Sequence, residues 1–265
     1  LLLALVMVLS LAACASSQPA AASTETAETA ETTEPAAEES AEAPAESGKT
    51  YTVGVCQLVQ HEALDAATQG FVDALKEELG DAVTVDVQNA SGDSVNCGTI
   101  VNGFVSKGVD LIMANATPAL TAAVSATADI PILGTSITAY GVALDIDDFN
   151  GTVGGNVSGT SDLADLQAQA QMILDWFPET KTVGLLFCSA EPNSRYQIDE
   201  VRKALEAQGV TCEEFAFTDS NDVSSVTQKA ADFSDVVYIP TDNTAASNTE
   251  AIANVLIPAG VPAIC

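Results

Sequence analysis

Five short polar segments of the sequence carry side chains that could bind a small charged solute. They are residues 57–61, 115–118, 135–138, 189–194 and 241–244. Their hydroxyls and amides can hydrogen-bond a ligand, and free N–H groups at helix N-termini attract an anion. Glu191 and Asp242 could accept a cation. Together these groups predict a site for a zwitterion such as an amino acid.

The predicted ligand-binding residues are polar or stand beside polar residues, and all but Asp162 lie in these five segments. They are Gln57, Gln60, His61, Thr117, Pro118, Ser136, Thr138, Asp162, Glu191, Asn193, Ser194, Asp242 and Asn243. Taken singly, most have an ordinary alternative, because Ser, Thr, Asn and Asp before a helix are common N-caps. Their recurrence at one predicted edge of two sheets favours a binding site. For His61, the one histidine of the sequence, ligand contact and a structural role both stay open.

Strands and helices alternate from Lys49 onward, in two runs separated by a glycine-rich stretch at 150–161. The predicted strands are 51–56, 83–87, 109–114, 130–134, 182–188, 210–217, 235–239 and 261–265. The predicted helices are 62–79, 94–107, 118–128, 165–177, 195–208, 223–233 and 245–257. Repeated strand–helix units with buried aliphatic strands indicate an α/β fold of two lobes, each a doubly wound parallel sheet. Ligands of such sheets bind beyond the carboxyl ends of the strands, where the polar segments fall.

The N-terminal residues indicate export. Leu1–Leu11 is an apolar run too short to span a bilayer. It leads into Ala12-Ala13-Cys14, which resembles a bacterial lipobox in which Cys14 is lipidated; an ordinary cleaved signal peptide is the alternative. Residues 15–48 have no large apolar side chain and only glutamates as charged residues, which predicts a disordered acidic tether.

The predicted domains follow from these composition changes. They are a signal peptide at 1–14, a tether at 15–48, lobe 1 at 49–158 and lobe 2 at 159–265. Because the sequence ends on a predicted strand, we expect a truncated C-terminus that lacks a return to lobe 1.

Charge and cysteine spacing narrow the classes of partner. The net charge of −29 argues against nucleic acid or an anionic membrane surface. One histidine and no C-x-x-C spacing predict no metal site and no cofactor. Cys188 and Cys212 fall in neighbouring predicted strands and are the best-placed disulfide pair. Buried reduced thiols are at least as good an interpretation.

No catalytic motif is present. The sequence has no Ser-His-Asp order, no G-x-S-x-G elbow and no P-loop, so no enzyme activity is predicted. Gly151, Gly154, Gly155 and Gly159 lack dinucleotide-loop spacing, which favours a hinge or loop. Residues 145–148 lack the glycine and final glutamate of a calcium loop, which favours a solvated turn.

Residues from about Val53 to Cys265 resemble the ABC transporter substrate-binding protein family that includes the tryptophan- and tyrosine-binding lipoproteins. The segments that carry the resemblance are GVCQLVQHEALDAATQGFVDAL, VDLIMANATPAL, GNVSGTSDL, CSAEPNSRYQIDEV and VYIPTDNTAASNTEAI. The resemblance implies a type I periplasmic-binding fold, a ligand cleft between two lobes, and delivery to a permease with a separate ATPase. Cys56, Cys97 and the absent C-terminal return segment depart from the family pattern.

The functional hypothesis is therefore an extracellular solute-binding lipoprotein of an ABC importer, anchored by lipid on the outer face of the cell membrane. It would capture a small amino acid-like ligand by hinge closure, with an aromatic preference that comes from the resemblance alone. Two alternatives stay open. One is a sensory module for a receptor kinase or chemoreceptor, and the other is an extracellular hydrolase that uses Glu191 and Asp242.

Overall fold

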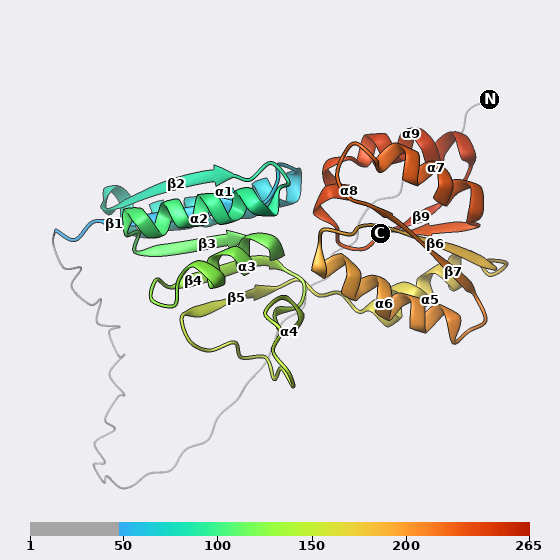
Figure 1. Cartoon of the computed structure of the whole chain (residues 1–265), viewed down its shortest axis with the longest axis horizontal. Coiled ribbons are helices and arrows are strands. Elements are labelled where there is room, and N and C mark those ends of the chain that lie inside the picture. The colour runs from blue at the N-terminus through green and yellow to red at the C-terminus, as the bar shows by residue number, and fades with distance from the viewer. Residues whose placement is uncertain (1–47) are drawn as a thin grey trace, which may run out of the picture. The chain divides into compact units, whose positions relative to one another are not determined.

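The computed structural model describes residues 48–265, in which helices flank two parallel β-sheets (Figure 1). The predicted signal peptide, lipidated Cys14 and tether lie outside the described residues, apart from Gly48 at the end of the tether. None of the helices within residues 48–265 has the length and apolar character needed to span a bilayer.

The first sheet has the strand order β2-β1-β3-β4-β5, and every neighbouring pair is parallel. Its strands are β1 (Tyr51–Gln57), β2 (Val83–Asn89), β3 (Leu111–Asn115), β4 (Ile132–Ile137) and β5 (Val157–Ser161). The accompanying helices are α1 (Glu62–Leu79), the 3-10 turn η1 (Gly80–Ala82), α2 (Ser94–Lys107), α3 (Thr117–Ala126) and α4 (Tyr140–Ala143).

The second sheet has the order β7-β6-β8-β9 and is also parallel throughout. Its strands are β6 (Thr182–Cys188), β7 (Thr211–Phe217), β8 (Val236–Tyr238) and β9 (Ala263–Ile264). The accompanying helices are α5 (Leu166–Trp176), α6 (Pro192–Glu206), α7 (Val223–Phe233), α8 (Asn243–Ser247) and α9 (Thr249–Ala259). The α/β class with two parallel sheets is therefore confirmed.

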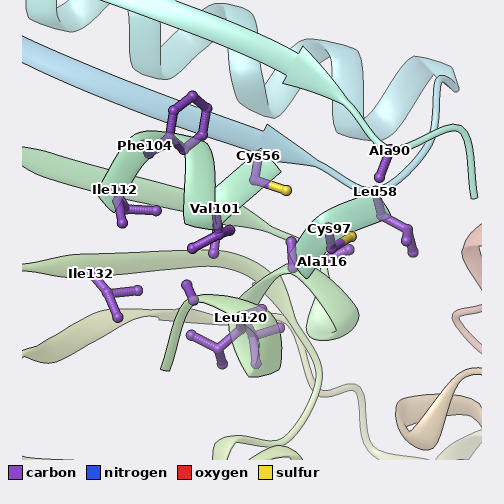
Figure 2. Close-up of a cluster of buried hydrophobic side chains, with 14 of the residues drawn as sticks. Cys56, Leu58, Ala90, Cys97, Val101, Phe104, Ile112, Ala116, Leu120 and Ile132 are labelled. Carbon is purple, nitrogen blue, oxygen red and sulfur yellow. The ribbon is translucent and has the colours of Figure 1, made fainter. Parts of the chain in front are cut away.

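Both faces of the first sheet are buried, which explains its continuous apolar strands. In β1, Val53 and Val55 pack toward Phe71 of α1. Cys56 points to the other face and joins a cluster that includes Phe104 of α2 (Figure 2). Because helices cover both faces, successive residues of the strand must all be apolar.

Helix ends follow local signals in the sequence. Asp93 caps α2 by accepting a hydrogen bond from the Val95 N–H at 2.8 Å. Gly108 ends the same helix in the left-handed conformation that glycine adopts without strain. The predicted limits of α2, residues 94–107, are confirmed for this reason.

The glycine-rich stretch at 150–161, predicted as a hinge or loop, contains a strand instead. Val157–Ser161 pairs with β4 as β5, so the expected lobe boundary at 158/159 falls inside a strand. Gly159 permits this pairing, because a Cβ there would collide with the Gly134 carbonyl oxygen and the Tyr140 hydroxyl. That hydroxyl donates to the Gly134 carbonyl oxygen at 3.0 Å. The strand depends on a missing side chain, so apolar periodicity does not reveal it.

Two helical features also differ from the prediction. The helix predicted at 245–257 is two helices that meet at Asn248. The Asn248 Nδ2 donates to the Thr244 carbonyl oxygen at 2.8 Å, a side-chain bond of the kind that competes with helix continuation. The single turn α4 was not predicted, since four residues are too few for a periodic pattern.

The predicted Cys188–Cys212 disulfide is wrong. β6 and β7 are neighbours, as expected, but their register pairs Cys212 with Val183 and Cys188 with Phe217. At the usual rise per strand residue, the two cysteines are about 16 Å apart along the sheet. That separation is beyond the reach of a disulfide, and both cysteines are free.

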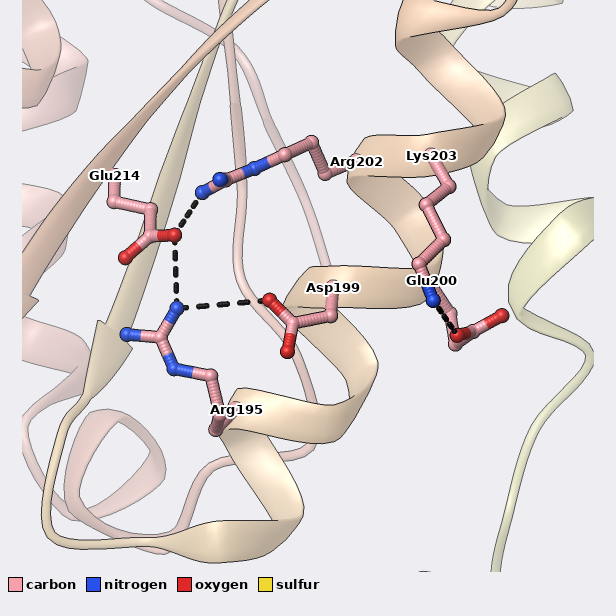
Figure 3. A network of polar contacts seen from close by, with 6 residues as sticks. All are labelled: Arg195, Asp199, Glu200, Arg202, Lys203 and Glu214. Carbon is pink, nitrogen blue, oxygen red and sulfur yellow. Dashed lines mark hydrogen bonds and ion pairs between the residues drawn. The ribbon is translucent and has the colours of Figure 1, made fainter.

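An ion-pair network links α6 to β7 (Figure 3). The Glu214 carboxylate pairs with Arg195 at 2.8 Å and also with Arg202. Burial opposes ionisation of Glu214, but the hydrogen bonds and charges of the two arginines outweigh it and lower its pKa. The network contains none of the predicted ligand-binding residues.

Candidate ligand-binding site

Polar side chains at the ends of β1 and β3 are linked by hydrogen bonds to one residue of α1, Thr68. The Gln57 Oε1 accepts a hydrogen bond from the Thr68 hydroxyl at 2.6 Å, and the Asn115 Nδ2 donates to the same hydroxyl at 2.9 Å. The Gln57 Nε2 donates to the Asp65 Oδ1 at 2.6 Å. Gln57 is therefore buried and held within its own lobe, whereas Gln60 is exposed.

Two non-glycine residues with positive φ stand at the ends of the neighbouring strands β3 and β4. Ala116 has φ 90° and Ser136 has φ 56°. The Ala116 N–H donates to the Thr135 carbonyl oxygen at 3.0 Å and so joins the two strand ends. Such backbone costs about 1–3 kcal/mol per residue and concentrates at functional sites. It marks this edge of the sheet as a candidate site.

Thr117 begins α3 and offers an unused hydroxyl. It is 2% exposed, and its Oγ1 has no hydrogen-bond partner among the described residues. Pro118 follows in the first turn, where its missing N–H costs nothing. The first turn of a helix leaves N–H groups without helical partners and carries partial positive charge. A carboxylate placed there could accept hydrogen bonds from the hydroxyl and from the backbone.

Thr138 and Asp162 lie beyond the ends of β4 and β5. The Asp162 N–H donates to the Ile137 carbonyl oxygen at 3.0 Å. Thr138 is buried and Asp162 is exposed. Thr138 lines a cavity of about 780 Å³ beside α4 and β5, but that lining has no charged side chain. The cavity offers a zwitterion no counter-charge, so the strand ends are the better candidate.

In the second sheet, Glu191 ties the turn after β6 to the start of α8. Its Oε2 accepts from the Asn243 N–H at 3.1 Å and from the Asn243 Nδ2 at 2.6 Å. Its Oε1 accepts from the Thr244 N–H and from the Thr244 hydroxyl, both at 2.9 Å. Glu191 is 2% exposed, so its carboxylate is fully engaged inside the lobe.

Asp242 makes the reverse connection, from the start of α8 to β6 and α6. Its Oδ1 accepts from the Ala245 N–H at 2.8 Å as the N-cap of α8. Its Oδ2 accepts from the Cys188 N–H at 2.6 Å and from the Ser194 hydroxyl at 2.7 Å. Glu191 and Asp242 thus join the same two turns with crossed hydrogen bonds.

The two carboxylates also influence one another electrostatically. Burial, with the added charge of Glu191, raises the pKa of Asp242 to about 7, although three hydrogen bonds to the carboxylate oppose the shift. Burial likewise raises the pKa of the adjacent Cys188 thiol to about 11. The ion pairs found within residues 48–265 include neither carboxylate. Within the described residues, these two carboxyl groups therefore have no cationic partner.

Asn193 and Gln197 complete the polar edge of the second sheet. The Asn193 Nδ2 donates to the Thr241 carbonyl oxygen at 3.0 Å, and the Gln197 Oε1 accepts from the Thr241 N–H at 3.1 Å. The Asn193 Oδ1 is buried and has no partner among the residues that the structure describes. It is an unused polar atom at a strand end, as are the Thr117 Oγ1 and the Asn115 Oδ1 in the first lobe.

His61 and Asn243 bring the two groups of predicted residues together. The His61 Nε2 lies 3.3 Å from the Asn243 Oδ1. A cavity of about 330 Å³ lies beside this contact and is lined by both residues, by Thr241 and by Asp242. The turn after β1 and the start of α8 therefore meet at one place.

The structure thus groups most of the predicted residues, while their contacts with a ligand stay predictions. Thr117, Pro118 and Ser136 stand together at the ends of β3 and β4. Sequence reasoning missed one partner of the predicted residues, Thr68, whereas the partners Asn115 and Thr244 lie in the predicted polar segments 115–118 and 241–244 but not among the predicted ligand-binding residues. A signal for Thr68 did exist, since it is a hydroxyl within the apolar face of α1.

Comparison with known proteins identifies the family. Residues 52–265 match the family model described as ABC transporter substrate binding protein. The chain belongs to this family. The predicted resemblance and the type I periplasmic-binding fold are therefore confirmed. The family is one of solute-binding proteins, which agrees with the prediction that the chain is not an enzyme.

Three relatives of the chain illustrate the similarity. A tyrosine-binding protein of Clostridioides difficile is 32% identical over 225 residues, which are 83% of this chain and 64% of the relative. The ABC domain from Streptococcus pneumoniae, solved in complex with L-Trp, is 34% identical with a TM-score of 0.76 over 81% of this chain and 73% of its own. A conserved domain protein from Vibrio cholerae is 33% identical with a TM-score of 0.77 over the same shares. The chain thus spans 64% of the length of the curated relative.

Proposed function

We propose that the chain is the solute-binding lipoprotein of an ABC importer and that it captures a small amino acid-like ligand for delivery to a permease. Family membership supports the role in import. The ligand contacts both lobes only when they close, so binding favours closure. The permease and its ATPase then act on the closed form.

The ligand class rests on the buried hydroxyl of Thr117. A buried hydroxyl without a partner costs about 1–3 kcal/mol relative to one that is hydrogen-bonded. The Thr117 Oγ1 is such a group, at the first turn of a helix that attracts negative charge. A ligand carboxylate would give the hydroxyl and the free N–H groups their missing acceptor.

The other charge of the ligand is proposed to face the turns that Glu191 and Asp242 join. Buried charges are normally paired, yet these two carboxylates accept only from neutral donors within their lobe. A ligand ammonium near Asn243 would be attracted by the negative charge of these groups without displacing those donors, and it would favour the ionised form of Asp242. The aromatic side chain is proposed from the relatives, one described as a tyrosine-binding protein and one solved with L-Trp.

The lipid anchor and location are proposed from the sequence pattern at the N-terminus. Cys14 would carry the lipid and residues 15–48 would connect it to the folded part, on the outer face of the cell membrane. A single cysteine that carries two acyl chains is enough to attach a protein stably to a membrane without a transmembrane helix.

Isothermal titration calorimetry with three matched ligands tests the proposal. L-Tyrosine should bind, whereas tyramine, which lacks the carboxylate, and 3-(4-hydroxyphenyl)propanoate, which lacks the ammonium, should bind about 100-fold more weakly. Equal binding of either analogue would contradict the zwitterion site. Binding of a sugar or nucleoside but of no amino acid would contradict the ligand class.

Variants of Thr117 test the hydroxyl itself. Thr117→Val keeps the shape of the side chain and should weaken L-tyrosine binding about tenfold, with tyramine binding unchanged. Because the hydroxyl has no partner in the free protein, the melting temperature should not fall. Thr117→Ser should keep wild-type affinity. A Thr117→Val variant with unaltered affinity would remove this hydroxyl from the site.

A further inference from the structure

Two buried thiols lie against each other between β1 and α2. Cys56 is the penultimate residue of β1, and Cys97 stands in the first turn of α2. Both are 0% exposed and belong to one apolar cluster (Figure 2). Each thiol is close enough to shift the pKa of the other, and both are free.

The fit of the helix on the strand holds this pair together. Gly54 and Cys56 point to the same face of β1, and Cys97 and Phe104 are seven residues apart on the same face of α2. A Cβ added to Gly54 would lie 2.5 Å from the Phe104 ring, so the helix packs directly on the strand backbone. The helix therefore meets the strand at two places: Phe104 packs on Gly54, and Cys97 lies beside Cys56.

We propose that Cys56 and Cys97 form an intramolecular disulfide when the chain folds in the presence of a low-molecular-weight disulfide such as oxidised glutathione. The Cys97 thiolate attacks the glutathione disulfide, which gives a mixed disulfide and releases one glutathione. Cys56 then attacks the Cys97 sulfur, and its proton leaves with the second glutathione. Two protein thiols are oxidised and one glutathione disulfide is reduced to two thiols.

The helix position of Cys97 makes it the attacking thiol. A place in the first turn of a helix favours a thiolate, and this effect is present as soon as α2 has formed. In the packed chain the pKa values shift in the same sense, because the neighbouring Cys56 lowers the pKa of Cys97 while Cys97 and burial raise the pKa of Cys56. Because neither sulfur is exposed, the reaction precedes final packing of α2 on β1. The disulfide would close a loop that contains α1 and β2 and would stabilise the first lobe.

A non-reducing tryptic map of the full chain tests the proposal. Cleavage after Lys49, Lys76 and Lys107 places Cys56 and Cys97 on the separate peptides 50–76 and 77–107. After refolding with oxidised glutathione, these peptides should run as one linked species that separates on reduction. Both cysteines alkylated in the oxidised, denatured chain would overturn the proposal, and so would a link from either one to another cysteine.

Thermal melting supplies the second measurement. The oxidised wild type should melt at least about 5 °C above the reduced protein, because a disulfide restricts the unfolded chain. Cys97→Ala should show no such difference and should leave Cys56 open to alkylation. Cys212→Ala, at a half-buried cysteine outside the pair, should keep the wild-type shift. These readouts need no ligand, so they succeed or fail independently of the proposed function.

Discussion

Asp242→Asn should flatten the dependence of stability on pH. Asp242 is 4% exposed, and burial with the charge of Glu191 raises its pKa from 3.8 to about 7. Between these values the folded protein keeps a proton that the unfolded chain has released. The protonated carboxyl therefore stabilises the fold fully below about pH 4, and this contribution is lost as the pH rises through 7.

The size of the effect follows from the two pKa values. At ~1.4 kcal/mol per pH unit, the difference between 3.8 and about 7 corresponds to ~4 kcal/mol. From pH 5 to pH 8 the wild type should lose ~3 kcal/mol more than the variant. Carboxyls with lowered pKa act in the opposite sense and at lower pH. They are Asp86, Asp110, Glu214 and Asp235.

Urea unfolding at pH 5, 6, 7 and 8 measures this difference. Trp176, the one tryptophan of the sequence, lies on α5 beside the second sheet, and its fluorescence reports the unfolding of that lobe. At pH 5 the variant should be about 1–3 kcal/mol less stable, because the amide nitrogen cannot accept a hydrogen bond in place of the carboxyl oxygen that it replaces. The exposed Asp129→Asn provides the matched control and should keep the wild-type slope. Parallel pH curves for the wild type and Asp242→Asn would refute the reasoning.

Substitutions at four further positions, two of them matched controls, probe packing and surface charge. Gly54→Ala should lose about 1–3 kcal/mol in urea unfolding because its Cβ would press on Phe104, whereas Gly103→Ala, with open space around its Cβ, should gain about 0.5–1 kcal/mol from helix propensity. Wild-type stability in Gly54→Ala would show that α2 can shift on β1 without loss of stability. Glu214→Gln should lose no more than about 1 kcal/mol, less in high salt, because its ion pairs are partly exposed. The exposed neighbour Glu213→Gln should be neutral, and equal losses at the two sites would contradict the role of the arginines.

The fold could be predicted from sequence where burial sets the pattern. β6, α1, α2 and α7 have the predicted limits because their apolar residues recur with the period of the element. β5 could not be predicted, because close backbone approach at Gly159 rather than side-chain burial holds it to the sheet. The Cys188–Cys212 pairing failed for a related reason. Strand adjacency could be inferred, but register depends on packing that no single strand encodes.

The candidate site was partly predictable because parallel strands place their carboxyl ends at one edge. That rule led to the turns that contain Thr117, Glu191 and Asp242. The internal bonding of those turns could not be predicted. Residue types suggested two carboxylates free to hold a cation, whereas the structure shows both bonded to backbone and side-chain donors of their own lobe. Only three-dimensional distances distinguish a free carboxylate from one that joins two turns.

The crossed bonds of Glu191 and Asp242 bear on any attempt to redesign ligand preference. Each carboxylate belongs to one turn and accepts hydrogen bonds from donors in or beside the other turn. Exchanging one turn alone would therefore remove hydrogen bonds that hold the other in shape. Replacing residues 189–194 with those of a relative would leave N–H donors at the start of α8 without acceptors. Residues 189–194 and 241–244 should therefore be exchanged together, and homologues that bind different ligands should differ in both segments.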